Sequence, residues 1–325
     1  PAGMYEFWAN HPQSLHQVTI LMSDRGIPAS YRNMNGYASH TLSFWNKNGE
    51  RFWVKWHFKT DQGIKTLSNE ESEKQSSHGN QEDLVNAIDR GEFPSWTVKV
   101  QLMPEADAST YKVNPFDLTK VWSHTDYPLL TIGKLVLDKN VQNYFAETEQ
   151  ATFTPGNLVP GIGASPDKVL QARLLSYGDA HRYRVGANHN QLPVNAPRCP
   201  VHHYQRDGAM AGTCPVQGMQ GNQGSEVNFY PNDRINAGAP SPDPSIAEPP
   251  LQLDDATVDR FDTMPEDNFS QAGDLFRLMS ESQKDQLARN IAGGLVQAHL
   301  DIQTRMLAQF EQADPDYRAR VEDLL

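Results

Sequence analysis

The chain has 325 residues, of which 38% are hydrophobic and 21% are charged. This composition excludes a disordered polyelectrolyte, and the length suits one large domain or about two smaller ones. The 40 acidic side chains outnumber the 28 basic ones and give a formal net charge of −12, which argues against nucleic acid or an anionic membrane as a general partner. No apolar run approaches the roughly 18 residues of a membrane-spanning helix, so we expect no membrane span.

The cysteine content points to a reducing compartment. Only Cys199 and Cys214 are present, which excludes a disulfide-dense scaffold. Together with His202 and His203 they fit no standard zinc spacing, and we interpret all four as structural or loop residues. We expect a cytoplasmic protein. A periplasmic one is the alternative, because the sequence opens at Pro1 and a targeting signal would lie upstream.

Hydrophobic residues at helical spacing open the chain. Leu15, Val18 and Leu21 lie three residues apart, and Gly26 and Pro28 end the pattern. This spacing predicts short helical pieces within residues 1–30.

From about residue 37 to residue 137 the period of the sequence changes to two. Alternating side chains in residues 51–59 predict a strand with two different faces, and a turn sequence ending in Gly49 joins it to the preceding strand. A charged helical insertion at 66–92 interrupts the series. Several antiparallel strands of this kind predict a barrel or a sandwich. The candidate strands are residues 40–45, 51–59, 95–102 and 133–137.

The rest of the chain has two different characters. Residues 141–250 are rich in proline, glycine and asparagine, and such a long stretch without periodicity is uncommon inside a compact domain. Its aromatic residues and an embedded helical run favour an extended segment that wraps another surface. Residues 254–325 are helical, with a Ser280/Gln283 capping pattern before a stripe of apolar residues.

These patterns predict an α+β fold made of three segments. Residues 1–139 form part of an antiparallel barrel with N-terminal helices. Residues 140–253 form the wrapping segment and carry one long helix. Residues 254–325 form a C-terminal helical domain.

The motif with the clearest chemistry is Arg173-Leu-Leu-Ser-Tyr177. Residues four apart lie on one face of a helix. A tyrosine binds ferric iron as a phenolate, and a guanidinium beside its oxygen favours that anion, so the pair suits an axial haem ligand. On spacing alone, a cation–π or hydrogen-bonded surface pair is the commoner interpretation.

The surrounding sequence resembles a known family. "RLLSYGDAHRYRVG" at 173–186 is similar to the proximal haem signature of the monofunctional haem catalases. Other segments resemble the same family in the same order, and the resemblance covers essentially the whole chain. These segments are residues 15–28, 34–41, 58–65, 114–122, 133–140, 143–150, 159–168 and 204–208.

The resemblance implies a role for each residue near the motif. Tyr177 would be the axial ligand of the haem iron, with Arg173 as its partner. His40 and Asp167 match the positions that extend this hydrogen-bond network. Two more residues match haem contacts: Arg184 at a propionate and His181 against the porphyrin.

A second set of residues matches the NADPH site of the smaller-subunit catalases. Arg25 and Lys59 are suited to a ligand that carries phosphates. On the residues alone, separate surface charges and core packing are the simpler interpretation. The matching positions are His16, Ser23, Arg25, Asn35, Lys59, Val121, Trp122, His124 and Gln271.

The resemblance further implies the activity and the assembly. The family disproportionates hydrogen peroxide to water and dioxygen with haem, which we expect to be of the b type, and the wrapping segment joins subunits into a homotetramer. The chain resembles roughly the C-terminal two-thirds of a small-subunit catalase. We expect the distal His and Asn upstream of Pro1, and therefore no catalytic residue within this chain.

Two alternatives stay open. One is a truncated haem- and NADPH-binding protein without peroxide turnover. The other is a catalase-related enzyme that acts on lipid hydroperoxides, which would keep the Arg-x-x-x-Tyr motif.

Overall fold

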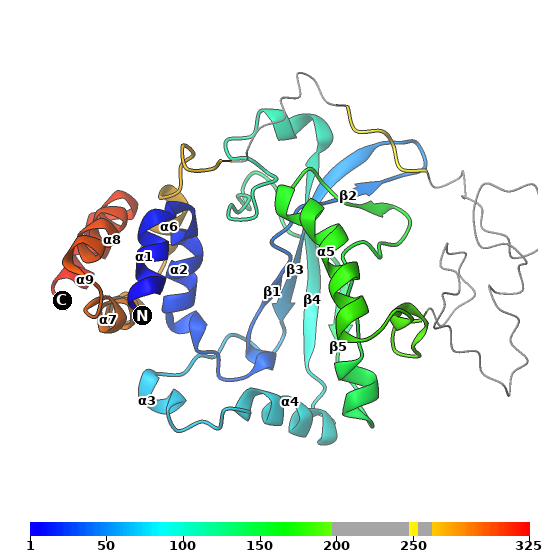
Figure 1. Cartoon of the computed structure of the whole chain (residues 1–325), viewed down its shortest axis with the longest axis horizontal. Coiled ribbons are helices and arrows are strands. Elements are labelled where there is room, and N and C mark those ends of the chain that lie inside the picture. Colours follow the sequence, from blue (N-terminus) through cyan, green and yellow to red (C-terminus); the bar gives the residue numbers. More distant parts are fainter. Residues whose placement is uncertain (197–246, 253–261) are drawn as a thin grey trace, which may run out of the picture. The chain divides into compact units, whose positions relative to one another are not determined.

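The structure is a computed structural model that describes residues 1–196, 247–252 and 262–325 (Figure 1). The four cysteine and histidine positions considered for zinc lie outside these residues. The chain divides into two compact units. The first unit comprises Pro1–Thr41, Val54–Lys139 and Leu253–Leu325, and the second comprises Leu42–Trp53 and Asn140–Gln252.

The described strands form one six-stranded sheet in the order β5-β4-β3-β2-β6, with β1 paired to β3. β1 pairs antiparallel with β3, β2 with β6, and β4 with β5. With the helices described below, this confirms the predicted α+β class. The strands are β1 (Gly36–Tyr37), β2 (Leu42–Trp45), β3 (Arg51–Thr60), β4 (Ser95–Pro104), β5 (Leu130–Val136) and β6 (Ile162–Gly163).

The predicted hairpin between β2 and β3 is confirmed, and its turn has a local cause. The side-chain oxygen of Asn46 accepts hydrogen bonds from the backbone nitrogens of Asn48 and Glu50, at 2.9 and 3.1 Å. Gly49 has a φ of 77°, a left-handed conformation that other residues adopt only with strain. The side chain of Asn46 and the conformation of Gly49 therefore both favour this turn.

The buried face of β3 is the more polar one. Arg51, Lys55 and His57 are buried, whereas Phe52 is exposed. The ammonium group of Lys55 donates to the backbone oxygens of Ser39, at 3.2 Å, and of Lys120, at 2.8 Å. A buried charge is costly unless such acceptors replace water.

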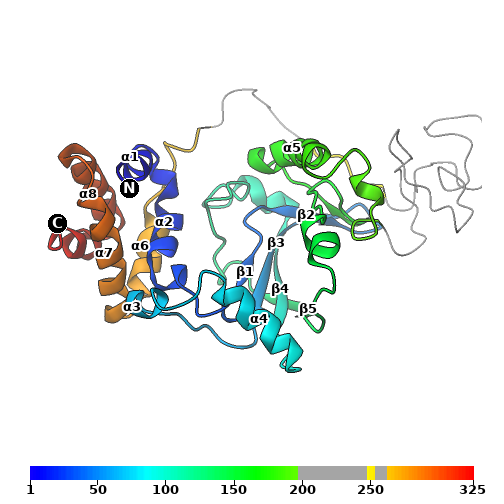
Figure 2. The same ribbon diagram turned by 60° about the horizontal axis from the view of Figure 1, so that its bottom comes forward.

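The N-terminal helices and the C-terminal helices share one hydrophobic core in the first unit (Figures 1 and 2). The hydroxyl of Tyr5 donates to the backbone oxygen of Ile291 at 2.8 Å. The ring of Tyr317 stacks on Phe276 and on Phe310, with centroids 4.7 and 4.6 Å apart. The helices are α1 (Ala2–Asn10), α2 (Leu15–Met22), α6 (Ser270–Arg277), α7 (Glu281–Leu295), α8 (Leu300–Ala313) and α9 (Pro315–Glu322).

The shared core belongs to one compact unit that contains both the N-terminal and the C-terminal helices. The helices after residue 262 pack with α1 and α2 in one compact unit, because Tyr5, Leu15 and other apolar side chains of the N-terminal helices bury themselves among them. The division into residues 1–139, 140–253 and 254–325 stays a prediction. The role of residues 140–253 as a wrapping segment stays a prediction.

The charged insertion is helical, as predicted. Its two helices are α3 (Asn69–Ser72) and α4 (Gly79–Asp89). Arg32 anchors α4 by donating two hydrogen bonds to the carboxylate of Asp83, at 2.6 and 3.0 Å, and the buried hydroxyl of Ser30 donates to the same carboxylate.

The remaining helical elements are one long α-helix, α5 (Lys168–Arg184), a short π-helix, η5 (Phe145–Glu149), and 3₁₀ turns. The 3₁₀ turns are η1 (Pro12–Ser14), η2 (Asp24–Gly26), η3 (Tyr31–Asn33), η4 (Glu105–Ser109) and η6 (His189–Gln191).

The shared helical core makes a prediction about stability. Leu287 is fully buried in it, whereas Leu278, nine residues earlier, is 84% exposed. Leu287→Ala should lower the free energy of unfolding by about 2–5 kcal/mol through lost apolar contact and the cavity left behind. Leu278→Ala should change it by less than about 0.5 kcal/mol. Urea denaturation followed by circular dichroism measures both, and equal effects would contradict the assigned core.

Candidate functional site

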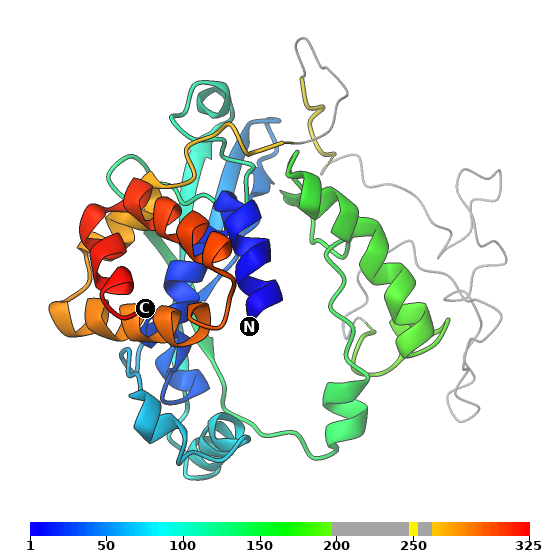
Figure 3. The ribbon, with the colours of Figure 1, turned by 60° about the vertical axis from the view of Figure 1, so that its left-hand side comes forward.

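Arg173 and Tyr177 both lie on the long helix α5, which is drawn as a green ribbon in Figure 3. The helix begins where it does because the buried carboxylate of Asp167 accepts hydrogen bonds from the backbone nitrogens of Val169, at 2.9 Å, and Leu170, at 3.1 Å. One Nη of Arg173 donates to the phenol oxygen of Tyr177 at 2.9 Å, and the guanidinium carbon lies 4.7 Å from the ring centroid. The predicted pairing of these two side chains on one helix face is confirmed.

His181 and Arg184 lie further along α5. The buried ring of His181 meets that of Tyr177 edge-on, with centroids 6.0 Å apart. The guanidinium of Arg184 donates to the backbone oxygens of Glu149 and Ala151, both at 2.6 Å. In this structure Arg184 therefore holds the segment before α5, and its contact with a propionate stays a prediction.

The residues of α5 fit a haem. Val169, Arg173 and Tyr177 follow one another at intervals of four, and Arg184 comes two turns later, so all four lie near one face. This face offers an oxygen donor with a cation on its oxygen and a second cation near its end. Phe153, whose backbone oxygen lies 3.4 Å from the imidazole of His181, is 87% exposed, so apolar surface for a macrocycle is available next to α5.

The two remaining predicted members of the proximal network are Asp167 and His40. Asp167 is the N-cap of α5, which gives it a structural role beside any contact with Arg173. His40 belongs to the other compact unit. Its predicted place in the network stays a prediction.

The dinucleotide candidates all lie in the first unit, and several of them gather around Tyr37. The phenol oxygen of Tyr37 accepts hydrogen bonds from the ammonium of Lys59, at 3.0 Å, and from the side-chain amide of Asn35, at 3.1 Å. Burial acts to raise the pKa of Tyr37, but these hydrogen bonds and the charges of Lys59 and Arg25 together hold it below its ordinary value. In the described part of the chain, neither Arg25 nor Lys59 has a carboxylate partner, so both charges are available to an anion.

Two histidines lie next to this cluster. The ring of His57 meets Tyr37 and His124 edge-on, with centroids 5.5 and 5.8 Å apart. Burial lowers the pKa of His57 to about 4, although its hydrogen bond with Gln101 opposes the shift. Burial and the charge of Lys59 also lower the pKa of His124. Both rings therefore stay neutral at pH 7 and add no charge of their own to the cluster.

A second group of candidates lies where residues 120–122 meet the start of α6. The backbone of Val121 and the side-chain amide of Gln271 exchange two hydrogen bonds, each of 3.0 Å. Trp122 is buried, with the ammonium of Lys55 lying 5.5 Å from its ring centroid. In this structure the side chain of Gln271 therefore holds the backbone of Val121. Its amide group has hydrogen-bonding capacity left for a ligand, because it makes one bond through its oxygen and one through its nitrogen.

The other two candidates are Ser23 and His16, and Ser23 has a local structural role. Ser23 is fully buried, where its hydroxyl donates to the backbone oxygen of Ile20 and accepts from the backbone nitrogen of Arg25. It thus shapes the turn that carries Arg25. Burial and the charge of Lys120 lower the pKa of His16.

Sequence reasoning missed three residues of this region. Tyr37, His57 and Gln101 connect the predicted positions to one another. Tyr37 stands two residues after Asn35, within a segment already singled out, and His57 alternates with Lys55 and Lys59 on one face of β3. Nothing in the sequence marks Gln101.

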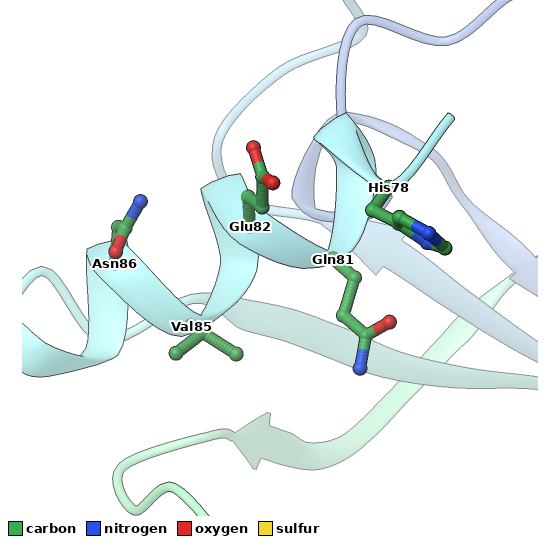
Figure 4. Close-up of a pocket in the computed structure, with 5 residues that line it drawn as sticks. All are labelled: His78, Gln81, Glu82, Val85 and Asn86. Atoms are coloured by element: carbon green, nitrogen blue, oxygen red, sulfur yellow. The ribbon is translucent and has the colours of Figure 1, made fainter. Parts of the chain in front are cut away.

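Two further observations on the described residues do not add to the candidate site. A depression of about 260 Å³ on α4 is lined by one face of that helix (Figure 4), and it contains none of the predicted residues. Its lining residues are His78, Gln81, Glu82, Val85 and Asn86. Among the described residues, no helix combines the length and apolarity required to cross a bilayer.

Comparison with known proteins identifies relatives along the whole chain. A family model described as Catalase matches residues 1–236, and one described as Catalase-related immune-responsive matches residues 263–325. The catalase of Aliivibrio fischeri is 53% identical over 324 residues, which make up 99% of this chain and 65% of that protein. The catalase of Streptomyces coelicolor is 50% identical over 330 residues, covering 99% and 66%.

Solved structures agree with the sequence relatives. Catalase A from Saccharomyces cerevisiae superposes with a TM-score of 0.86 at 38% identity, covering 99% of this chain and 67% of that one. A bacterial catalase superposes with a TM-score of 0.84, also at 38% identity. The chain belongs to the catalase family. It spans about 65% of the length of relatives such as the Aliivibrio protein.

The buried His57 generates a prediction about pH. Because its pKa falls from 6.5 to about 4 on folding, the unfolded chain binds more protons at this residue between those values. The stability it contributes is therefore full above pH 6.5 and is lost as the pH falls through about 4, by up to about 3 kcal/mol.

His57→Gln should remove that part of the pH dependence. Denaturant unfolding at a series of pH values, compared with the exposed His299→Gln, measures the difference. An unchanged slope in His57→Gln would show that His57 is not neutral in the folded state.

Proposed function

We propose that this chain forms the proximal side of a haem site in an enzyme that disproportionates hydrogen peroxide to water and dioxygen. The observation that carries the proposal is the 2.9 Å hydrogen bond from Arg173 to the phenol oxygen of Tyr177. Membership of the catalase family supports it, since relatives bearing the name catalase are 50–53% identical to this chain. We assign no residue of this chain as the distal acid–base group.

The residues of α5 divide the work of holding the haem, which we expect to be of the b type and to supply the redox-active iron. Tyr177 provides the axial oxygen, and the permanent charge of Arg173 favours the phenolate over the phenol. The cap made by Asp167 fixes the start of α5 and with it the position of the pair. Arg184 offers a cation for a propionate, which would have to compete with the backbone oxygens that the guanidinium now binds.

We also propose that the cluster around Tyr37 binds NADPH. The support is the pair of cations, Arg25 and Lys59, that face Tyr37 without a described carboxylate partner. Phosphate groups carry the charge and the acceptor oxygens that such a pair lacks. Neutral His57 and His124 give the same region flat, uncharged surfaces for the rings of a dinucleotide.

Assembly and location follow the same family relationship. We propose a homotetramer to which residues 140–253 contribute, in the cytoplasm. Analytical ultracentrifugation of the whole protein tests the assembly, and a monomer at micromolar concentration would contradict it.

The haem proposal is tested by removing the phenol oxygen of Tyr177 while keeping its aromatic ring. Tyr177→Phe should reduce haem occupancy to near zero or change the ferric spectrum, with loss of activity, because the phenyl ring cannot bind iron. Arg173→Lys should lower haem affinity by about tenfold, since it keeps the charge without the planar fork. Tyr183→Phe, on the same helix and 81% exposed, is the control. The haem-to-protein ratio decides, and full occupancy in Tyr177→Phe would assign the iron to another residue.

The dinucleotide proposal is tested by removing its cations. The double change Arg25→Ala with Lys59→Ala should weaken NADPH binding by about tenfold to a hundredfold for each charge-assisted hydrogen bond lost. The initial rate of peroxide consumption should stay nearly unchanged, because the disproportionation needs no hydride.

Arg90→Ala with Lys139→Ala removes the same charge from exposed positions of the same unit and serves as the control. Fluorescence titration with NADPH measures affinity in the three proteins. Equal affinity in all of them, or no binding in the parent, would overturn the proposal.

A further inference from the structure

Three aromatic rings form a continuous row in the first unit. The indole of Trp122 meets the ring of Tyr127 with centroids 5.8 Å apart, and Tyr127 meets Tyr111 at 5.3 Å. Trp122 is buried, whereas the two tyrosines are half-buried. The row thus leads from a buried indole towards a phenol that solvent reaches.

Each tyrosine in the row holds its phenolic hydrogen on a carboxylate. The hydroxyl of Tyr127 donates to Asp107 at 3.1 Å, and that of Tyr111 donates to Asp126 at 3.0 Å. Burial, together with Asp107, raises the pKa of Tyr127 to about 12, so this phenol is protonated at rest. A phenol that loses an electron also loses its proton, and in both cases an acceptor is already in hydrogen-bond contact.

The indole end differs from the phenols. In the described part of the chain the buried nitrogen of Trp122 has no acceptor for its hydrogen. The ammonium of Lys55 lies 5.5 Å from the ring centroid. An oxidised Trp122 would therefore keep its proton and its positive charge next to another cation, an arrangement that favours passing the charge on.

We propose that Trp122, Tyr127 and Tyr111 form a relay that moves an oxidising equivalent from the buried indole to the protein surface. Trp122 is also one of the positions that match the NADPH site, but the relay rests on the ring and carboxylate contacts described above and needs neither cofactor to be bound. The starting oxidant is a soluble cobalt(III) ammine complex, which takes one electron from Trp122, leaves the indole radical cation and is itself reduced to cobalt(II). An electron from Tyr127 restores the indole, and the phenolic proton of Tyr127 goes to Asp107.

The second step repeats the first and returns Tyr127 to its resting state. An electron from Tyr111 reduces the Tyr127 phenoxyl radical, which takes its proton back from Asp107. The proton of Tyr111 goes to Asp126. The net change is one electron and one proton lost by Tyr111 and one electron gained by Trp122, and a soluble one-electron reductant such as ascorbate then restores Tyr111.

The relay is tested by photo-oxidation of the whole chain with light at the red edge of indole absorption, where phenols do not absorb, and with a cobalt(III) ammine complex as the electron acceptor. A nitroso spin trap captures tyrosyl radicals, and mass spectrometry of peptides locates the adducts and the oxidised tryptophans. We expect an adduct at Tyr111 and little oxidation of Trp122. Ascorbate should suppress the adduct.

Tyr127→Phe keeps the ring but removes the oxidisable phenol. It should lower the Tyr111 adduct several-fold and raise oxidation of Trp122 by a similar factor. Trp122→Phe should lower the adduct as well, because it removes the origin of the charge. Tyr31→Phe, an exposed tyrosine of the same unit, is the control and should change neither yield.

Asp107→Asn gives an independent test that leaves all three rings in place. It removes the proton acceptor of Tyr127, so it should lower the Tyr111 adduct and raise Trp122 oxidation even if Tyr127→Phe fails to fold. An unchanged Tyr111 adduct in folded Tyr127→Phe or in Asp107→Asn would overturn the relay.

Discussion

The hydrogen bonds between residues 120–122 and 267–271 hold the first unit together in a way that apolar packing alone cannot. The buried ammonium of Lys120 donates to the backbone oxygen of Asp267, at 2.6 Å, and to the side chain of Asn268, at 2.8 Å. Its own backbone oxygen accepts from Lys55 on β3. The two buried cations Lys55 and Lys120 thus link β3 to residues 120–122, and residues 120–122 to the start of α6. Neither can lose an acceptor without leaving a charge unsolvated, which makes the arrangement specific as well as stable.

The same constraint explains the unusual polarity of β3. A strand with apolar and polar side chains in alternation ordinarily buries the apolar set. Here Lys55 and His57 lie on the buried side because each has a fixed partner there, in backbone oxygens and in Gln101. The cost of burying them is offset by hydrogen bonds that position Trp122, Val121 and Gln271. The positions of these candidate dinucleotide residues therefore depend on the same hydrogen bonds that stabilise the unit.

The sequence predicted those features that depend on interactions between residues close together in the chain. The turn at Asn46–Gly49, the capping box of Ser280 and Gln283, and the Arg173–Tyr177 pair each depend on residues within a few positions, and the structure has all three. Contacts such as those of Lys120 with Asn268 or Arg184 with Glu149 join a side chain to distant or backbone atoms. Such contacts leave no periodic pattern in the sequence, so they could not be predicted from it.

The hydrogen bond from Tyr5 to Ile291 has a consequence for how the chain is made. The helices α1 and α2 leave the ribosome well before residues 270–322, which supply the apolar surfaces that cover them. Their core therefore cannot close until those residues have been made, and contacts of such large sequence separation form slowly. Until then Tyr5, Trp8 and Leu15 present apolar surface to water and to other nascent chains. A cell that produces this protein must protect α1 and α2 until residues 270–322 have been made.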